Sequence, residues 1–244
     1  MTVDYVPLLD VARNLYRMPL GQARFQEYLR VLRTDDRSYV RYPPLVSMNP
    51  MAKEHVLACI DAYRALDADA IARATIEASC SSGAFAPSSR SFSLGFGVVD
   101  DVQGGWTNRA AVEHDACFAF GVSFKAGWIS VLLWASELPH PATVRDVVAL
   151  AIARTAYVER HGMPETLRAK IAQERTVHVI TGVAVPTLDV QTADRMRRAV
   201  EPHLDATDMR TAIECLAGDE AAASLGFTPR GIPRHAAWAR DVGE

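Results

Sequence analysis

The stretch SFSLGFGV, residues 91–98, decides the fold class because its large apolar residues alternate strictly with small ones. One face carries phenylalanine, leucine and valine, and the other carries serine or glycine. This period of two predicts a half-buried strand. Gly95 and Gly97 share one face, which lets another backbone or a ligand approach the strand closely.

The residues before this strand are expected to be helical as far as about residue 85. Residues 8–16 and 25–32 place apolar side chains at helical spacing. Asn49-Pro50 is typical of a helix start, with asparagine as the cap and proline in the first turn. A further helix is predicted from about Asp69 to Cys80.

Two more alternating runs follow the strand, at residues 118–124 and 128–136. Only Lys125-Ala126-Gly127 separates them, and a short link that ends in glycine predicts an antiparallel hairpin. The second run is apolar on both faces, which is typical of a central strand. Residues 177–185 alternate as well and are predicted to form a fourth strand.

The remaining periodic segments are helical in pattern, at about residues 144–158, 164–174, 192–200, 209–216 and 220–225. We therefore expect an α+β fold, with N-terminal helices, a small antiparallel or mixed sheet of about four strands, and C-terminal helices. No long linker divides the chain, so a single domain is expected over residues 1–244, helical in 1–85, sheet-centred in 90–185 and helical in 187–244.

Composition limits the class of protein. The chain has 244 residues, 49% of them hydrophobic and 23% charged, with a net charge of −3, which is ordinary for a globular protein. Its basic residues are scattered, so we expect no nucleic-acid partner. The apolar runs are too short for a bilayer, so we expect no membrane partner. Four isolated cysteines and the lack of a secretory signal favour a cytoplasmic location.

The polar loop of residues 100–115 is the first candidate site. If the strand of residues 91–98 pairs antiparallel with the predicted hairpin, this loop meets Glu137 and His140 at one sheet edge. Carboxylates and histidines gathered there suit general acid–base or divalent-metal chemistry. The expected catalytic residues are Glu113, His114 and Glu137. The expected substrate-binding residues are Trp106, Asn108 and Arg109, and the candidate metal ligands are Asp101, Glu113 and His114.

Simpler interpretations compete with this site. A parallel crossover after Asp100 would scatter the same groups, and paired aspartates or glycines are ordinary turn residues. Residues 49–55 form a second candidate, in which a helix N-terminus strengthened by Lys53 binds an anion while His55 stays neutral. A plain capped helix explains that pattern more simply.

The expected function is the binding of a small polar or anionic molecule at the 100–115 loop, with acid–base or divalent-metal chemistry if the protein is an enzyme. The alternative is a non-catalytic interaction or assembly protein that uses this loop and the C-terminal arm, residues 228–234. The arm carries few apolar residues of its own, while Phe227, Ile232 and Trp238 need cover. A homodimer is therefore expected, since two-fold dimers are the commonest assembly.

Overall fold

The computed structural model describes residues 1–34, 39–52, 54–82, 89–102, 107–119, 121–238 and 240–241. These residues group into two compact units, each with its own buried apolar core. Unit one comprises Met1–Thr107 and Phe120–Thr155, and unit two comprises Asn108–Ala119 and Ala156–Glu244. The expectation of a single domain stays a prediction. No helix in the described ranges has the length and apolar character needed to cross a bilayer.

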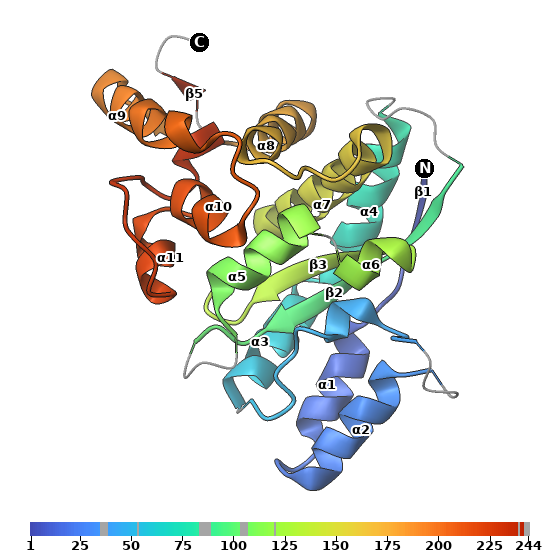
Figure 1. Ribbon diagram of the computed structural model, residues 1–244. Helices are drawn as coiled ribbons and strands as arrows, with labels where there is room; N and C mark the ends of the chain where they lie inside the picture. The colour runs from blue at the N-terminus through green and yellow to red at the C-terminus, as the bar shows by residue number, and fades with distance from the viewer. Residues whose placement is uncertain are drawn as a thin grey trace. The chain divides into compact units, whose positions relative to one another are not determined.

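A parallel sheet of three strands forms the centre of unit one (Figure 1). Its order is β1 (Thr2–Tyr5), β2 (Ser91–Val99) and β3 (Trp128–Trp134). β2 lies between the other two strands and is buried along most of its length. Both strand pairs are parallel, so the carboxyl ends of β2 and β3 meet at one edge, where Val99 pairs with Trp134.

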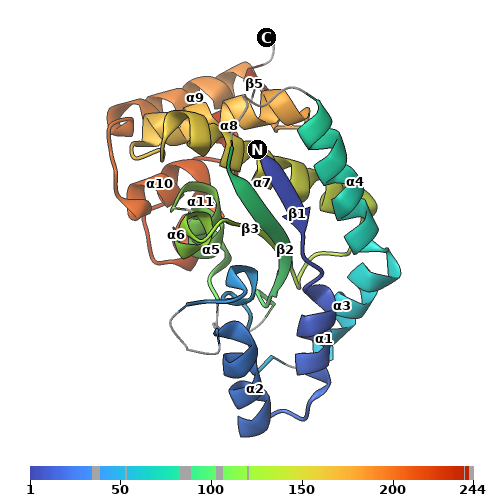
Figure 2. The ribbon, with the colours of Figure 1, turned by 90° about the vertical axis from the view of Figure 1, so that its right-hand side faces the viewer.

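Helices cover this sheet and supply the rest of the core of unit one. Phe96 and Val98, the last two residues of the apolar face of β2, contribute to the same core. Figure 2 shows α4 beside β1, in agreement with their contacts. The elements are α1 (Leu9–Arg17), α2 (Gln22–Leu32), a short 3-10 turn (Pro43–Leu45), α3 (Glu54–Ala65), α4 (Ala68–Ser81), α6 (Gly121–Lys125) and the first part of α7 (Pro141–His161).

Unit two is largely helical. Its C-terminal arm packs on the unit itself, because Ile232 is 1% exposed and belongs to the core of the unit. Asp219 accepts hydrogen bonds from the arm at Arg230, Gly231 and Ile232. Its elements are α5 (Arg109–His114), a π-helical turn (Asp115–Ala119), α8 (Leu167–Thr181), β4 (Thr187–Leu188), α9 (Val190–Val200), α10 (Met209–Leu216), α11 (Asp219–Ser224) and β5 (Arg240–Asp241), with 3-10 turns at Glu201–His203 and Ala236–Trp238.

The predicted hairpin is wrong, and with it the antiparallel or mixed sheet. Residues 118–119 fall in the π-helical turn and residues 121–124 in α6, and β3 is an edge strand, not a central one. Apolar residues at every second position also recur at every fourth, so this alternation fits a helix face as well as a strand. Gly127, in the left-handed region at φ +73°, follows α6 and donates its N–H to the Phe124 carbonyl.

The predicted strand at residues 177–185 is also wrong, because α8 continues to Thr181. Val177 is fully buried and Val179 is 70% exposed, whereas a strand would place both on one face. Gly182 caps the helix at φ +68° and donates its N–H to the His178 carbonyl. Glycine in this conformation is a common helix end.

The close backbone approach expected at the glycines of β2 is confirmed at Gly97. A Cβ atom at Gly97 would lie 2.0 Å from the backbone oxygen of Pro44. At Gly95 the nearest atom is 2.7 Å away and is the Cδ1 of the Leu8 side chain. The 3-10 turn therefore packs directly against the backbone of the central strand.

We expect Gly97→Ala to lower the free energy of unfolding by about 1–3 kcal/mol, because the Pro44 backbone must move to admit the methyl group. Gly95→Ala is the matched control and should cost less, since the Leu8 side chain can rotate away. Urea denaturation measures both values. Equal losses in the two variants would contradict this account of the strand.

Candidate functional site

Asp100 is the buried polar group at the carboxyl end of the central strand. It follows β2 directly, and its side chain is only 4% exposed. His55 Nε2 lies 2.8 Å from Oδ1, and Asn49 Nδ2 donates to Oδ2 at 3.2 Å. The backbone N–H of Val102 also points to Oδ1, at 3.4 Å. A buried carboxylate is stable only with such partners.

His55 is held by this carboxylate in one tautomer. It lies in the first turn of α3, and its side chain is 35% exposed. A carboxylate only accepts hydrogen bonds, so Nε2 carries the proton that is shared with Asp100. The neutral ring then has its lone pair on Nδ1, for which no partner is found among the described residues. A partly exposed imidazole oriented in this way has the chemistry of a general base.

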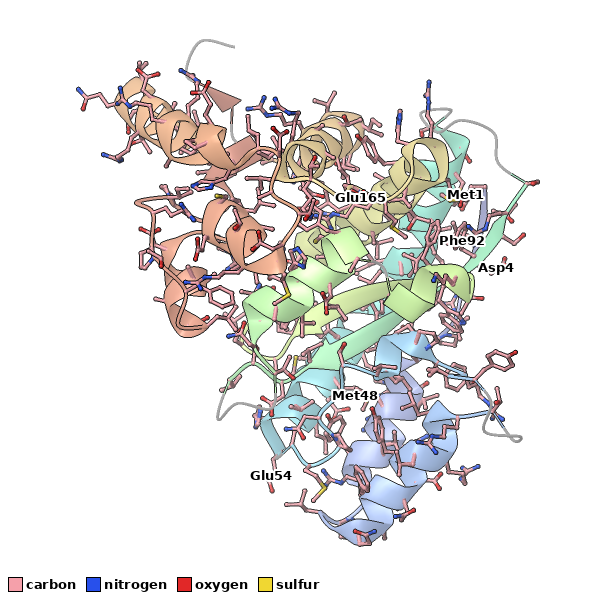
Figure 3. All side chains as sticks on the ribbon, in the orientation of Figure 1. Met1, Asp4, Met48, Glu54, Phe92 and Glu165 are labelled. Carbon is pink, nitrogen blue, oxygen red and sulfur yellow. The ribbon has the colours of Figure 1, made fainter. Side chains whose placement is uncertain are left out.

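Residues 49–52 form a turn that brings Asn49 to Asp100. Asn49 Oδ1 accepts from the Met51 N–H at 3.0 Å, and its backbone oxygen accepts from the Ala52 N–H. The helix predicted to start at Asn49-Pro50 therefore begins later, at Glu54. Figure 3 labels Met48 and Glu54, which lie on either side of this turn.

Arg24 on α2 fixes this turn through the backbone. It is 7% exposed and donates to the carbonyl oxygens of Pro50 and Ala52, and also to those of Tyr16 and Met18 at the end of α1. The Tyr16 hydroxyl donates to the Asn49 carbonyl at 2.7 Å. Burial, and then the charge of Asp100, raise the pKa of Tyr16, so its hydroxyl stays a donor.

A second aspartate joins β2 to the segment that follows β3. Asp101 accepts from the Ser136 N–H at 2.9 Å and from the Ser136 hydroxyl at 2.7 Å. Directly before this contact, the Ala135 N–H donates to the Val99 carbonyl. The carboxyl ends of the two strands are thus tied together by side-chain and backbone bonds.

Cys59 and Glu137 both lie at the carboxyl end of β3, where the Glu137 N–H donates to the Trp134 carbonyl. Cys59 lies one helical turn after His55 on α3, and its thiol is close to the Trp134 carbonyl. Burial raises the pKa of Cys59 to about 11, and the charges of Asp101 and Glu137 add to the effect. The thiol therefore stays protonated near neutral pH and does not serve as a nucleophile.

Asp101 is bonded to Ser136, the residue before Glu137, although not through a hairpin, and a shared site of Asp101 and Glu137 stays a prediction. Parallel strands place their carboxyl ends side by side, and this explains the contact. His140 is exposed, and its Nδ1 accepts from the Ala142 N–H at the start of α7. Trp106 lies outside the described residues.

The other predicted site residues belong to unit two and make contacts within it. Asn108 caps α5 by accepting from the Ala111 N–H, and it donates to Ser224. Glu113 accepts from Arg109 at 2.7 Å and from Arg234 at 2.9 and 3.0 Å. Their predicted roles in catalysis and substrate binding stay predictions.

His114 is an apolar-packed histidine in unit two. Its ring centroid lies 5.5 Å from that of Phe118, and both ring nitrogens are buried without a hydrogen bond. Burial lowers the pKa of His114, although Asp115, 3.5 Å away, acts in the opposite direction. The ring is therefore neutral near pH 7.

In the described ranges, no group of three or more histidine, cysteine, aspartate or glutamate side chains is arranged to hold a metal ion. Metal binding by Asp101, Glu113 and His114 stays a prediction.

Sequence reasoning missed the pairing of His55 with Asp100. The sequence pattern assigns His55 and Asp100 to two separate candidate sites. The available signal was Thr2–Tyr5, a short β-prone segment at the start of the chain. This segment pairs in parallel with β2, and the residues that follow each strand of a parallel sheet meet at one edge.

No protein family, curated protein or solved structure matches this chain. A function is therefore inferred from the geometry of its own residues.

We expect Arg24→Met to lower the free energy of unfolding by about 2–4 kcal/mol, because several buried carbonyls lose donors that contribute about 1 kcal/mol each. Arg30→Met on the same helix is the matched control. The Arg30 side chain is 70% exposed, and its loss should cost less than about 0.5 kcal/mol. Urea denaturation compares the two, and similar values would show that the Arg24 bonds do not hold the turn.

His114 should make the protein sensitive to acid. Its folded pKa lies below the ordinary 6.5, so the unfolded chain binds the proton more readily. The contribution of His114 to the free energy of unfolding is therefore fully present above about pH 6.5 and is lost as the pH falls below that value. His114→Gln should flatten the fall in urea midpoint between pH 7 and 5, whereas His161→Gln, which alters an exposed ring, should not. An unchanged slope in His114→Gln would refute this role.

Proposed function

We propose that the protein binds a small polar molecule at the carboxyl edge of the unit-one sheet and transfers a proton there, with His55 as general base and acid. One observation carries this proposal. A partly exposed imidazole donates from Nε2 to a buried carboxylate 2.8 Å away, at the end of the central strand. This arrangement orients the ring and leaves its second nitrogen for chemistry.

The proton transfer follows from the hydrogen bonds. Nδ1 of the neutral ring accepts a proton from a bound hydroxyl, amine or activated C–H group, and the ring becomes a cation. The Asp100 carboxylate stabilises this cation through the Nε2–H bond, while Asn49 holds the other carboxylate oxygen. His55 then returns the proton from Nδ1 to the product. Oriented acid–base groups of this kind accelerate reactions by about 10²–10⁴-fold.

The position supports the proposal as well. Ligands of open parallel sheets bind outside the carboxyl ends of the strands, and Asp100, Asp101 and Ser136 all follow strand ends. Of the loop predicted as a site, residues 100–115, the proposed site therefore includes only the first residues, Asp100 and Asp101. The location in the cytoplasm, the homodimer and the alternative of an assembly protein stay predictions.

Nitrogen-15 NMR of labelled histidine tests the dyad directly. At pH 8 we expect the His55 ring to carry its proton on Nε2 and none on Nδ1, with His55→Gln identifying the signals. The opposite tautomer would rule out Nδ1 as the base.

Activity is tested with a panel of carbonyl compounds in D₂O and a panel of small esters. His55→Gln and Asp100→Asn should each reduce any turnover by about 10²–10⁴-fold. His140→Gln is the control, since that exposed ring only caps α7. Turnover that survives in His55→Gln would contradict the proposed function.

A further inference from the structure

We infer that the ligand of this edge is an amphipathic molecule without negative charge, with a hydroxyl or amine next to a compact apolar body. This inference rests on the proposed function and specifies its substrate class. It follows from exposed apolar residues on the loops that carry the polar groups of the site and from the charges that the edge presents.

Three loops carry the polar residues of the site, and each also exposes a large apolar side chain. Met51 is 39% exposed, Val102 is 43% exposed and Leu138 is 90% exposed. We call these three residues the apolar rim. Each lies within two residues of a polar group of the site, namely Asn49, Asp100 and Ser136.

Hydrogen bonds fix two members of the rim beside the dyad. The Met51 N–H donates to Asn49 Oδ1, and the Val102 N–H points to Asp100 Oδ1. Because Asn49 and Asp100 are themselves bonded, Met51 and Val102 flank one polar pair.

The third member belongs to the same edge. Leu138 comes two residues after Ser136, which is bonded twice to Asp101. An apolar body that touched these three side chains would bury surface now in water, at about 25 cal/mol per Å².

The charges at this edge disfavour an anion. Asp100, Asp101 and Glu137 contribute three carboxylates, and the last two raise the pKa of the Cys59 thiol in addition to burial. The Arg24 guanidinium is bonded to the turn of residues 49–52, but it donates there only to backbone carbonyls. A hydroxyl or ammonium group meets acceptors here, whereas a carboxylate meets repulsion.

A small molecule, and not a protein, is the committed occupant because the loops of the rim also carry a partly exposed base and the groups bonded to it. The Nδ1 atom of His55 requires a reacting proton within hydrogen-bond distance. A hydroxyl or amine on a short apolar body reaches Nδ1 while the body rests on the rim.

Binding is tested with benzylamine, benzyl alcohol, benzoate and methylamine, using chemical-shift changes in the folded, full-length protein. Benzylamine and benzyl alcohol should bind and perturb the methyl groups of Met51, Val102 and Leu138. Benzoate and methylamine should each bind at least ten-fold more weakly, since one carries the wrong charge and the other lacks the apolar body.

Variants separate the contributions. Leu138→Ser should weaken benzylamine binding by roughly ten-fold. Leu20→Ser is the matched control, because Leu20 is 53% exposed and lies outside the rim. Glu137→Gln should reduce the preference for benzylamine over benzoate.

The inference would be overturned if benzoate bound more tightly than benzylamine, and more so if Lys53→Gln then lost that benzoate binding. It would also be overturned if methylamine bound as tightly as benzylamine, or if both aromatic probes failed to bind at millimolar concentration. His55→Gln should still bind benzyl alcohol. Binding without the expected His55 tautomer would therefore refute the proposed function alone, and the correct tautomer without binding would refute the substrate class alone.

Discussion

The buried carboxylate of Asp100 is the constraint on which the site of unit one depends. A carboxylate at 4% exposure needs hydrogen-bond donors, and β2 itself offers none to its oxygens. The donors come from Asn49, His55 and Val102, which precede or follow it in three separate stretches of chain. Satisfying one buried group therefore fixes the turn before α3, the first turn of α3 and the exit from β2. The same bonds that stabilise the fold determine the tautomer of the exposed imidazole.

The helices were largely predictable because local signals determine them. The range predicted for α10 matches the observed Met209–Leu216, and α7, at Pro141–His161, includes the helix predicted at about residues 144–158. The direction of the sheet was not predictable in this way. Alternation reports which residues share a face but not which strands pair, and it also fitted helical segments in residues 118–124 and 177–185. The four-residue β1 was missed, and it adds a third parallel strand beside β2, which already pairs in parallel with β3.

The candidate site was predicted in part for the same reason. Asp101 and Glu137 follow the ends of two real strands, so the prediction that they share one edge survives the change from antiparallel to parallel pairing. Glu113 and His114 were added because of a hairpin that does not exist. Asn49 and His55 lie 51 and 45 residues before Asp100, and no local pattern reports a contact over such a separation.

The acids of unit two serve a different purpose from those at the sheet edge. Glu214 is 2% exposed; burial opposes its ionisation, but bonds from Thr228, Arg210 and Arg230 lower its pKa overall. Glu113 is likewise paired with Arg109 and Arg234. Arginine partners of this kind hold the C-terminal arm, and they leave Glu113 and Glu214 with little capacity to act as acids or bases.

The turn before α3 shows how a rigid site can keep variable side chains. Arg24 and Tyr16 hold it entirely through backbone carbonyls, at Asn49, Pro50 and Ala52. Backbone acceptors are present whatever side chain follows, so the position of His55 does not depend on the identity of Met51. That side chain is 39% exposed, and under the proposed function we expect a substitution there to change ligand binding without moving the base. A clamp made of backbone bonds thus separates the chemistry of the site from its specificity.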